Sequence, residues 1–320
     1  MTSLKKQKLK KVSKGIGVAI IIYIMVSILA TKIVYDFVFQ RQPAQIVQNV
    51  HHYKNNSDVT YKSFSYSCGD SILRSTLYSQ KQPNNDLIVI VPGFNAQKTT
   101  YEGIIFSFIK EGFDVFAFDP TGHGESGGKS SMGFPQIIND IDSTLDFINN
   151  NNDFKYDNIF LLGHSRGGYG VCCTMNNYPN VAAAVSVNGV DTSMDAIMAY
   201  STQYAGKIAY ANYPFLNIYQ DIIFGRETSS KSAIEEINKS KIPVLIIQSE
   251  NDEQIPKDKY SIYSNKQKST AQNTEFLLYN KTGYDGHSSI FYNEQQQPNS
   301  DIVKIISDFY KKTSDKDLLK

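Results

Sequence analysis

Ser165 lies in a short turn bounded by glycines and is the residue best suited to act as a nucleophile. The run Gly163-His164-Ser165-Arg166-Gly167 directly follows an apolar stretch at residues 158–162 and precedes a helical pattern at residues 168–178. Such a strand-to-helix turn needs its flanking glycines, because a Cβ at either place would collide with neighbouring backbone. We expect the Ser165 hydroxyl to project at the carboxyl end of a strand, above a helix N-terminus that favours developing negative charge.

A serine hydroxyl is a weak nucleophile at neutral pH and needs a base to take its proton during attack. The chain contains five histidines. His287 is placed best, because it comes just after the last predicted strand and so lies in a loop at the same sheet edge as Ser165. The others lie in a polar connector, in a glycine turn, or beside Ser165 and facing away from it: His51, His52, His123 and His164. We therefore predict His287 as the base.

A histidine base needs a buried carboxylate that holds its tautomer and stabilises the imidazolium. Asp252 follows the apolar run at residues 244–247, which again places it at the carboxyl end of a strand. Asp191 follows the preceding strand and is the main competitor, and Glu250 and Asp285 are weaker ones. The alternative role for each carboxylate is helix capping or a solvated loop. We predict Asp252 as the residue that orients the base.

From residue 64 onward, short apolar runs alternate with helical patterns, which is typical of an α/β fold with a mostly parallel sheet and helices on both faces. The runs are apolar on successive residues, as buried strands are, and lie at residues 87–91, 114–118, 158–162, 181–187, 244–247 and 275–279. Apolar residues with three-and-four spacing predict one-sided helices near residues 101–108, 137–148 and 302–309. An antiparallel pair at the sheet edge is expected at residues 62–67 and 72–79.

One interval, residues 188–241, separates two predicted strands by far more than the other connections. We expect it to carry a helical cap at about residues 190–240. Its aromatic residues either wall an acyl pocket or pack the cap onto the sheet: Tyr200, Tyr204, Tyr210, Tyr213, Phe215, Tyr219 and Phe224. The sequence leaves both roles open.

The order Ser165, Asp252, His287 on such a sheet is that of the α/β-hydrolase superfamily, which the chain resembles over roughly residues 64–312. The run DPTGHGESG, which begins at Asp119, is similar to a turn of the serine aminopeptidase and monoacylglycerol lipase branch. The resemblance implies an α/β-hydrolase fold and a serine hydrolase that cleaves an acyl ester or lipid-like substrate through an acyl-enzyme. A peptidase or amidase, an acyltransferase and a catalytically silent binding domain are the alternatives.

An acyl-transfer site also needs two preset donors for the oxyanion of its tetrahedral intermediate. By the same resemblance, these donors are the backbone N–H groups of Phe94 and Arg166. The sequence departs from the family at Pro92, where histidine often precedes the glycine. Because the donors belong to the main chain, this departure affects the packing of the loop more than the chemistry.

No cofactor and no metal are expected. The run Gly128-Lys129-Ser130 resembles the end of a phosphate-binding loop, but the first glycine of that loop would fall at His123. The sequence has no HExxH motif and no paired CxxC, so it predicts no catalytic metal. Three cysteines, two of them neighbours at Cys172 and Cys173, form no disulfide framework.

The N-terminus combines a basic cluster with an uncharged apolar stretch. The whole chain is nearly balanced, with 32 Lys and Arg against 31 Asp and Glu, and suggests no nucleic-acid partner. The first 14 residues, however, contain six lysines and no acid. Residues 15–31 carry no charge and extend to about 20 residues by snorkelling of Lys32, enough to cross a bilayer core of roughly 30 Å. A cleaved signal is the alternative, but Ile28 stands where a small residue should precede the cleavage site.

These patterns divide the chain into five parts. We expect a basic cytoplasmic N-terminus at residues 1–14, a transmembrane signal anchor at 15–35, a juxtamembrane connector at 36–63, the α/β-hydrolase domain at 64–312 and a polar tail at 313–320. Lysine-rich flanks stay on the cytoplasmic side, so the domain is expected to be extracytoplasmic. The expected partners are the membrane and a small-molecule acyl substrate, and the sequence indicates no oligomeric state.

Overall fold

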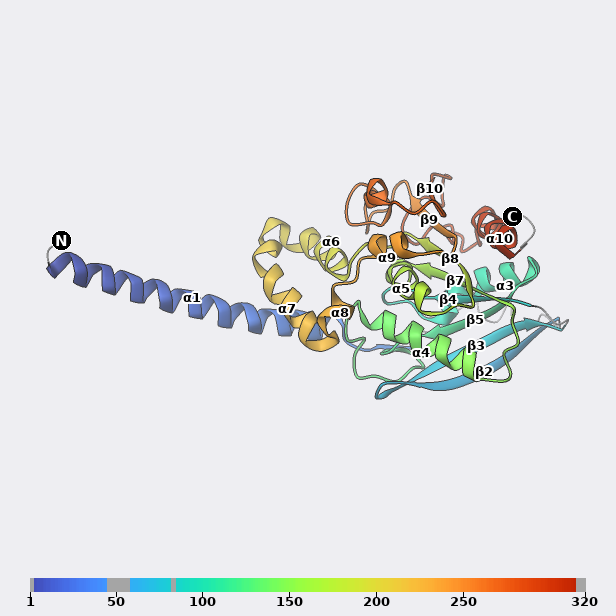
Figure 1. Cartoon of the computed structure of the whole chain (residues 1–320), viewed down its shortest axis with the longest axis horizontal. Coiled ribbons are helices and arrows are strands. Elements are labelled where there is room, and N and C mark those ends of the chain that lie inside the picture. The colour runs from blue at the N-terminus through green and yellow to red at the C-terminus, as the bar shows by residue number, and fades with distance from the viewer. Residues whose placement is uncertain (1–2, 45–57, 82–84, 315–320) are drawn as a thin grey trace.

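The computed structural model describes residues 3–44, 58–81 and 85–314, which form a body from which one long helix projects (Figure 1). The centre of the body is an eight-stranded sheet in the order β10-β9-β8-β7-β4-β5-β3-β2. The predicted parallel strands are confirmed, each within two residues of its expected end: β4 (Asp86–Val91), β5 (Asp114–Asp119), β7 (Asn158–His164), β8 (Val181–Val187), β9 (Val244–Ser249) and β10 (Thr274–Tyr279).

The predicted antiparallel pair at the sheet edge is also present. β2 (Val59–Cys68) pairs with β3 (Ser71–Gln80), and β3 pairs antiparallel with β5. β2 begins inside the segment that was expected to be a connector, because Val59 already pairs with Gln80 at the far end of the ladder. His51 and His52, assigned to the same connector, lie outside the described residues.

Helices cover both faces of the sheet, as predicted. One face carries α4 (Gln136–Asn150), α5 (Arg166–Thr174) and α9 (Ala233–Lys239). The other carries α3 (Glu102–Lys110) and α10 (Ser300–Ser314). Most apolar residues of the three predicted helical stripes are buried against the sheet, and Ile305 is partly buried. Short 3-10 turns complete the connections: η1 (Lys98–Tyr101), η2 (Met175–Asn177) and η4 (Tyr263–Lys268).

The long interval between β8 and β9 forms a helical cap. The cap consists of α6 (Ser193–Ala205), η3 (Gly206–Asn212), α7 (Tyr213–Phe224) and the short α8 (Arg226–Ser229). It is narrower than the expected 190–240, because α9 packs against α5 over the sheet and so belongs to the body.

The projecting helix is α1 (Ser3–Val38). Among the described residues, Lys10–Val38 is the segment long and apolar enough to cross a membrane, and most of it is exposed, unlike a core helix. α1 ends three residues beyond the predicted span and leads into β1 (Gln42–Pro43), which pairs with β6 (His123–Gly124). Arg41 also donates hydrogen bonds to the carbonyl groups of Gly124 and Gly128. The helix is thus fastened to the turn that follows β5.

Candidate active site

Ser165 occupies the sharp turn between β7 and α5. Its backbone has φ 53° and ψ −117°, in the positive-φ region where a residue other than glycine is strained. A Cβ on Gly163 would lie 2.1 Å from the carbonyl oxygen of Gly167, and one on Gly167 would lie 2.1 Å from that of Val91. Only glycine at both positions lets the chain turn this tightly after β7, and the turn sets Ser165 at the carboxyl end of the strand.

His287, in the loop after β10, contacts Asp252, in the loop after β9. The Nδ1 atom of His287 lies 2.9 Å from Oδ1 and 2.8 Å from Oδ2 of Asp252. The two side chains are only 3% and 0% exposed, so water hardly competes for this contact. Because a carboxylate only accepts hydrogen bonds, Nδ1 carries the ring proton and Nε2 is left with a lone pair. The ring is therefore in the tautomer that a general base needs.

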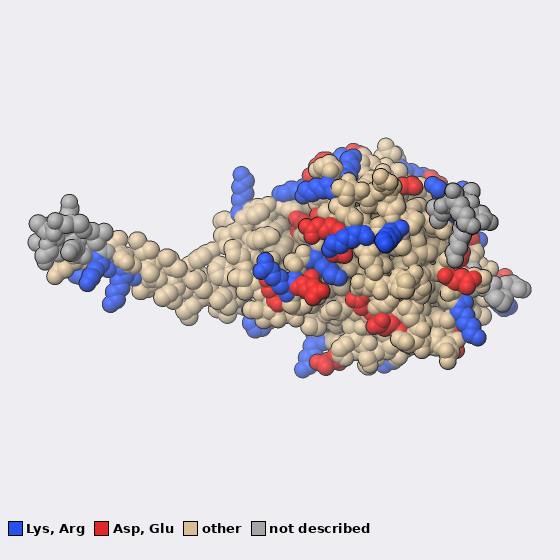
Figure 2. Space-filling model, viewed as in Figure 1, with Lys and Arg blue, Asp and Glu red and all other residues tan. Residues whose placement is uncertain are grey.

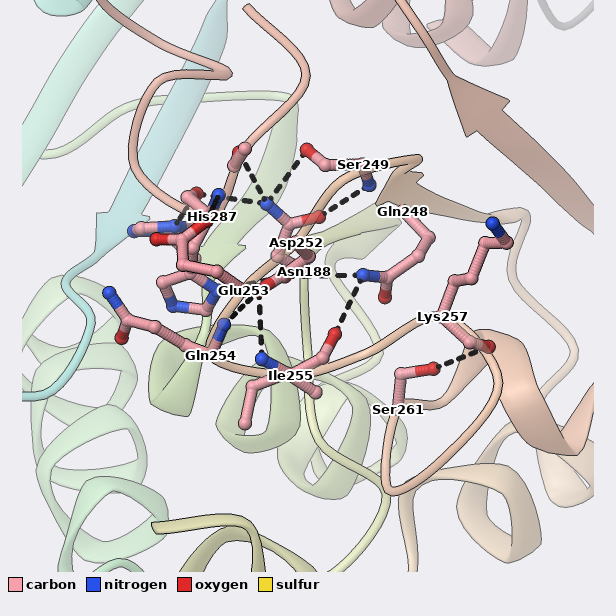
Figure 3. Close-up of polar contacts among 12 residues, drawn as sticks. Asn188, Gln248, Ser249, Asp252, Glu253, Gln254, Ile255, Lys257, Ser261 and His287 are labelled. Carbon is pink, nitrogen blue, oxygen red and sulfur yellow. Dashed lines mark hydrogen bonds and ion pairs between the residues drawn. The ribbon is translucent and has the colours of Figure 1, made fainter. Parts of the chain in front are cut away.

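The carboxylate of Asp252 is held by further donors (Figure 3). The backbone N–H groups of Gln254 and Ile255 donate to Oδ1 at 2.9 and 2.8 Å. The side-chain amide of Gln248, at the end of β9, donates to Oδ2 at 3.2 Å. These bonds fix the orientation of the carboxylate toward His287.

The competing carboxylates have other partners. Asp191 accepts hydrogen bonds from the Ser232 hydroxyl and the Ile234 backbone N–H at the start of α9, so it acts as a helix cap, and burial raises its pKa above the ordinary value. Glu250 pairs with Lys257, and Asp285 accepts from Asn251. Within residues 3–44, 58–81 and 85–314, no three side chains of His, Cys, Asp and Glu are grouped to hold a metal ion.

Tyr101 and His164 join the loop after β4 to the loop of His287, a link that the sequence pattern does not predict. The Gly93 N–H donates to the Tyr101 hydroxyl oxygen at 3.1 Å, and that oxygen lies 2.8 Å from His164 Nδ1. His164 Nε2 lies 3.0 Å from the carbonyl oxygen of His287. Since a carbonyl only accepts, Nε2 carries the proton and Nδ1 accepts from Tyr101. Burial lowers the pKa of His164 to about 3, which keeps this ring neutral.

Asn188, placed just after β8, also holds the His287 loop, and the sequence pattern does not predict this role (Figure 3). Its amide nitrogen donates to the carbonyl oxygen of His287 at 2.9 Å and to the Ser249 hydroxyl at 3.0 Å. Its amide oxygen accepts from the Ser249 N–H at 2.7 Å. Asn188 therefore ties the His287 loop to the end of β9, from which Asp252 follows.

Of the two expected oxyanion donors, Arg166 directly follows Ser165 in the chain, and Phe94 lies in the loop after β4. A Cβ on Gly93, which precedes Phe94, would lie 3.3 Å from the Ser165 Cβ, so the loop after β4 passes close to Ser165. Among the described residues, neither the Phe94 N–H nor the Arg166 N–H has a hydrogen-bond partner. The buried Arg166 guanidinium lies 5.6 Å from the centre of the Phe94 ring, and burial lowers the pKa of Arg166 to about 10. Two N–H groups without partners near the Ser165 side chain are of the kind that can stabilise an oxyanion.

Ser165, His164 and His287 line a cavity of about 990 Å³. Its wall is mostly apolar and comes from the end of α1, the cap and the loop after β4, including Tyr35, Phe39, Phe94, Ile197, Tyr200, Tyr204 and Leu216. Of the cap aromatics, Tyr200 and Tyr204 thus line the cavity, whereas Phe215 and Tyr219 pack against α1. The cavity suits an extended apolar group with a polar reacting centre beside Ser165.

Known structures share this architecture. An esterase of Pyrococcus furiosus matches 85% of this chain and 98% of its own at 18% identity, with a TM-score of 0.63. The esterase Est1E of Butyrivibrio proteoclasticus, solved with ferulic acid, matches 79% of this chain and 100% of its own at 18% identity and a TM-score of 0.60. A proline iminopeptidase of Mycobacterium smegmatis matches 79% and 98% at 13% identity and a TM-score of 0.53. At such identities the likeness concerns the fold, and this chain has the α/β-hydrolase fold.

Part of the sequence also matches a family model. Residues 82–209 match the family described as serine aminopeptidase, S33. The matched stretch includes the Phe94 loop, the turn after β5 and Ser165, and it ends before Asp252 and His287. The family model and the structural neighbours thus agree on the α/β-hydrolase fold.

Curated relatives match only parts of the chain. An uncharacterised protein of Caenorhabditis elegans is 28% identical over 191 residues, which is 57% of this chain and 35% of the relative. Protein phosphatase methylesterase 1 of Candida albicans is 26% identical over 105 residues, 33% of this chain and 29% of the relative. The chain thus spans about a third of the length of the curated relatives that it matches.

Proposed function

We propose that this protein is a membrane-anchored serine hydrolase that cleaves an acyl ester, with Ser165 as nucleophile, His287 as general base and Asp252 as the residue that orients the base. The observation that carries the proposal is that Ser165 and His287 line one apolar cavity, and that His287 is paired with the buried Asp252. The esterase folds among the structural neighbours and the methylesterase relative support the ester class.

The geometry supports an acyl-enzyme mechanism. Ser165 Oγ attacks the acyl carbon while His287 Nε2 takes the hydroxyl proton, and the N–H groups of Phe94 and Arg166 stabilise the oxyanion. The bond from the acyl carbon to the leaving oxygen breaks, and His287 gives its proton to the departing alcohol. Water then attacks the acyl-enzyme with His287 again as base, which releases the carboxylic acid and restores Ser165.

Amide or peptide hydrolysis is the second candidate, because the matched family is described as serine aminopeptidase and one neighbour is a proline iminopeptidase. The same triad also permits acyl transfer to an alcohol. Paired ester and amide substrates with the same acyl group, given to the full-length protein with and without an added acceptor alcohol, separate these reactions. We expect the ester to be cleaved much faster than the amide, with the free acid as product. A preference for the amide would reassign the protein as a peptidase.

The assignment of the orienting carboxylate gives a sharp prediction. Asp252→Asn keeps the shape of the side chain but no longer enforces the Nδ1–H tautomer of His287, so kcat is expected to fall on the order of 10⁴-fold. The matched variant is Asp191→Asn, which removes a helix-capping carboxylate and is expected to lower thermal stability while leaving kcat nearly unchanged. Equal losses of kcat in the two variants would mean that Asp252 has no special role.

We further propose that α1 is retained as an anchor, with the N-terminus cytoplasmic and the hydrolase domain outside. Tyr35, in the last turn of α1, and Phe39, directly after the helix, are almost fully buried, which supports a permanent helix over a cleaved signal. In sealed vesicles with the native orientation, added protease is expected to digest the hydrolase domain and to spare an epitope placed before Lys5. Protection of the domain instead would reverse the proposed topology.

A further inference from the structure

One face of α1 packs against the cap, far along the helix from the point where it joins the body. The residues of this face repeat every four positions, and Phe39 continues the spacing directly after the helix. All but the first are nearly fully buried: Tyr23, Ser27, Thr31, Tyr35 and Phe39. The Tyr23 hydroxyl donates to the carbonyl of Ala211 at 2.6 Å, and its ring lies edge-on to Phe215. Asn212 donates to the Thr31 hydroxyl at 2.8 Å. The cap therefore runs beside the apolar part of α1 (Figure 1).

If α1 crosses a bilayer, the charged residues on α1 indicate how deep in the bilayer the contact between α1 and the cap lies. Lys32 and Asp36 form a largely exposed ion pair at one end of the apolar stretch, as expected at the level of the lipid headgroups. Lys14 precedes Lys32 by 18 residues. This corresponds to roughly 27 Å of helix, close to the thickness of a bilayer core of about 30 Å. Tyr23 precedes Lys32 by 9 residues, so its contact with the cap falls near the middle of the hydrocarbon.

The outer surface of the cap is suited to that environment. Between Lys207 and Asp221 the chain has no charged residue. Tyr204 is 90% exposed and Ile208 79% exposed, and two isoleucines of α7, Ile218 and Ile222, are more than half exposed. Figure 2 shows that charged residues gather on the body and near the N-terminal end of α1, with a largely uncharged surface between them. Exposed aliphatic side chains in this number are unfavourable in water and favourable in lipid.

The cavity beside Ser165 reaches this uncharged surface. Val34, Phe37 and Val38 of α1 line the cavity and are also exposed on the outside of the molecule, Phe37 to 71%. On the side of the cap, Tyr204 of α6 also lines the cavity and is exposed on the outside of the molecule. The cavity therefore opens between α1 and α6, next to the residues that the ion pair of Lys32 places at the headgroup level.

We propose that the cap lies in the outer half of the bilayer that α1 spans, and that the acyl ester reaches Ser165 from this leaflet through the opening between α1 and α6. The substrate class is a lipid ester with a long acyl chain, and α1 serves as a wall of the acyl site as well as an anchor. This inference rests on the proposed function, and the reaction is unchanged: the ester C–O bond breaks, the alcohol leaves with a proton, and water completes the fatty acid.

The bilayer suits this surface better than another protein does. The apolar surface of the cap is continuous with α1, so a water-soluble partner would have to follow α1 into the hydrocarbon. A second copy of this chain, inserted in the same membrane, is the other possible occupant, and the test below distinguishes it.

The position of the cap is measured with a fluorescent thiol label on Ile218→Cys in the full-length protein, reconstituted in phosphatidylcholine vesicles. The three native cysteines are buried, and burial raises the pKa of Cys68 to about 12, so they react poorly. Lipids with a nitroxide halfway along the acyl chain are expected to quench this label severalfold more than a label on Lys312→Cys, in α10 at the far end of the body (Figure 1). Equal quenching at both positions, or a label at 218 shielded from lipid by a second copy, would overturn the proposal.

The access route is tested with the double variant Ile208→Asp/Ile218→Asp, whose residues do not line the cavity. Its hydrolysis of a short soluble ester is expected to stay near the wild-type rate, whereas that of a long-chain ester held in vesicles falls about tenfold or more, because carboxylates keep the cap out of hydrocarbon. The matched control is Ile72→Asp, an exposed isoleucine of β3, which should affect neither substrate.

The two substrates keep this inference separate from the proposed function. Unchanged hydrolysis of both esters by the double variant would overturn access from the bilayer and leave the serine hydrolase intact. If the wild-type protein cleaves neither ester, the proposed function itself fails.

Discussion

The Ser165→Ala variant is expected to lose nearly all esterase activity, with kcat falling on the order of 10⁶-fold. Alanine removes the oxygen that attacks the acyl carbon, and the His287–Asp252 pair then has no proton to take. What rate remains comes from substrate binding and the two oxyanion donors. The measurement is the steady-state hydrolysis of a short soluble ester by the full-length protein.

The fold should survive this change, because no hydrogen bond of the Ser165 hydroxyl holds the described structure together. The matched control is Ser201→Ala, which removes another hydroxyl from the same cavity wall and is expected to retain most of the rate. Substantial activity in Ser165→Ala, with an unchanged melting temperature, would show that the nucleophile is a different residue.

The kcat of the His287→Gln variant is expected to fall by a factor comparable to that of Ser165→Ala, since glutamine occupies similar space but cannot take the serine proton at neutral pH. His164→Gln is the informative comparison, because His164 lines the same cavity and its neutral ring only holds the neighbouring loops. We expect a far smaller loss of kcat there than in His287→Gln.

The double variant Ser165→Ala/His287→Gln tests whether the two residues act as a unit. Residues that share one proton transfer are strongly non-additive, so the double variant should be about as slow as either single variant. Losses that multiply would indicate that Ser165 and His287 contribute independently, which the proposed mechanism forbids.

The architecture was largely predictable from the sequence because its signals are local. Strands buried on both faces appear in the sequence as unbroken apolar runs, and the apolar residues of helices α4 and α10 are spaced so that they fall on one side of each helix. The signal for the Ser165 turn is equally local, because the two glycines that the turn requires, Gly163 and Gly167, lie within two residues of Ser165. These features required no knowledge of distant contacts.

The remaining features depend on contacts between distant segments. Tyr101 belongs to an apolar helical stripe in the sequence, and nothing there marks its hydroxyl as the partner of His164, 63 residues away. Asp191 and Asp252 both follow strands in the sequence. Only their hydrogen-bond partners show that Asp191 caps a helix and that Asp252 contacts His287. The role of α1 in the cavity wall was likewise hidden, because an apolar stretch of that length predicts a membrane span and nothing about what packs beside it.

Labelling with a fluorophosphonate tests the activation of Ser165 most directly. The reagent phosphonylates a serine whose hydroxyl is deprotonated by a neighbouring base, and an ordinary surface serine does not react. After digestion, mass spectrometry is expected to locate the adduct on Ser165, and the His287→Gln variant should show almost none. An adduct on another residue, or a protein that cleaves esters without forming any adduct, would contradict the assignment of Ser165 as the nucleophile.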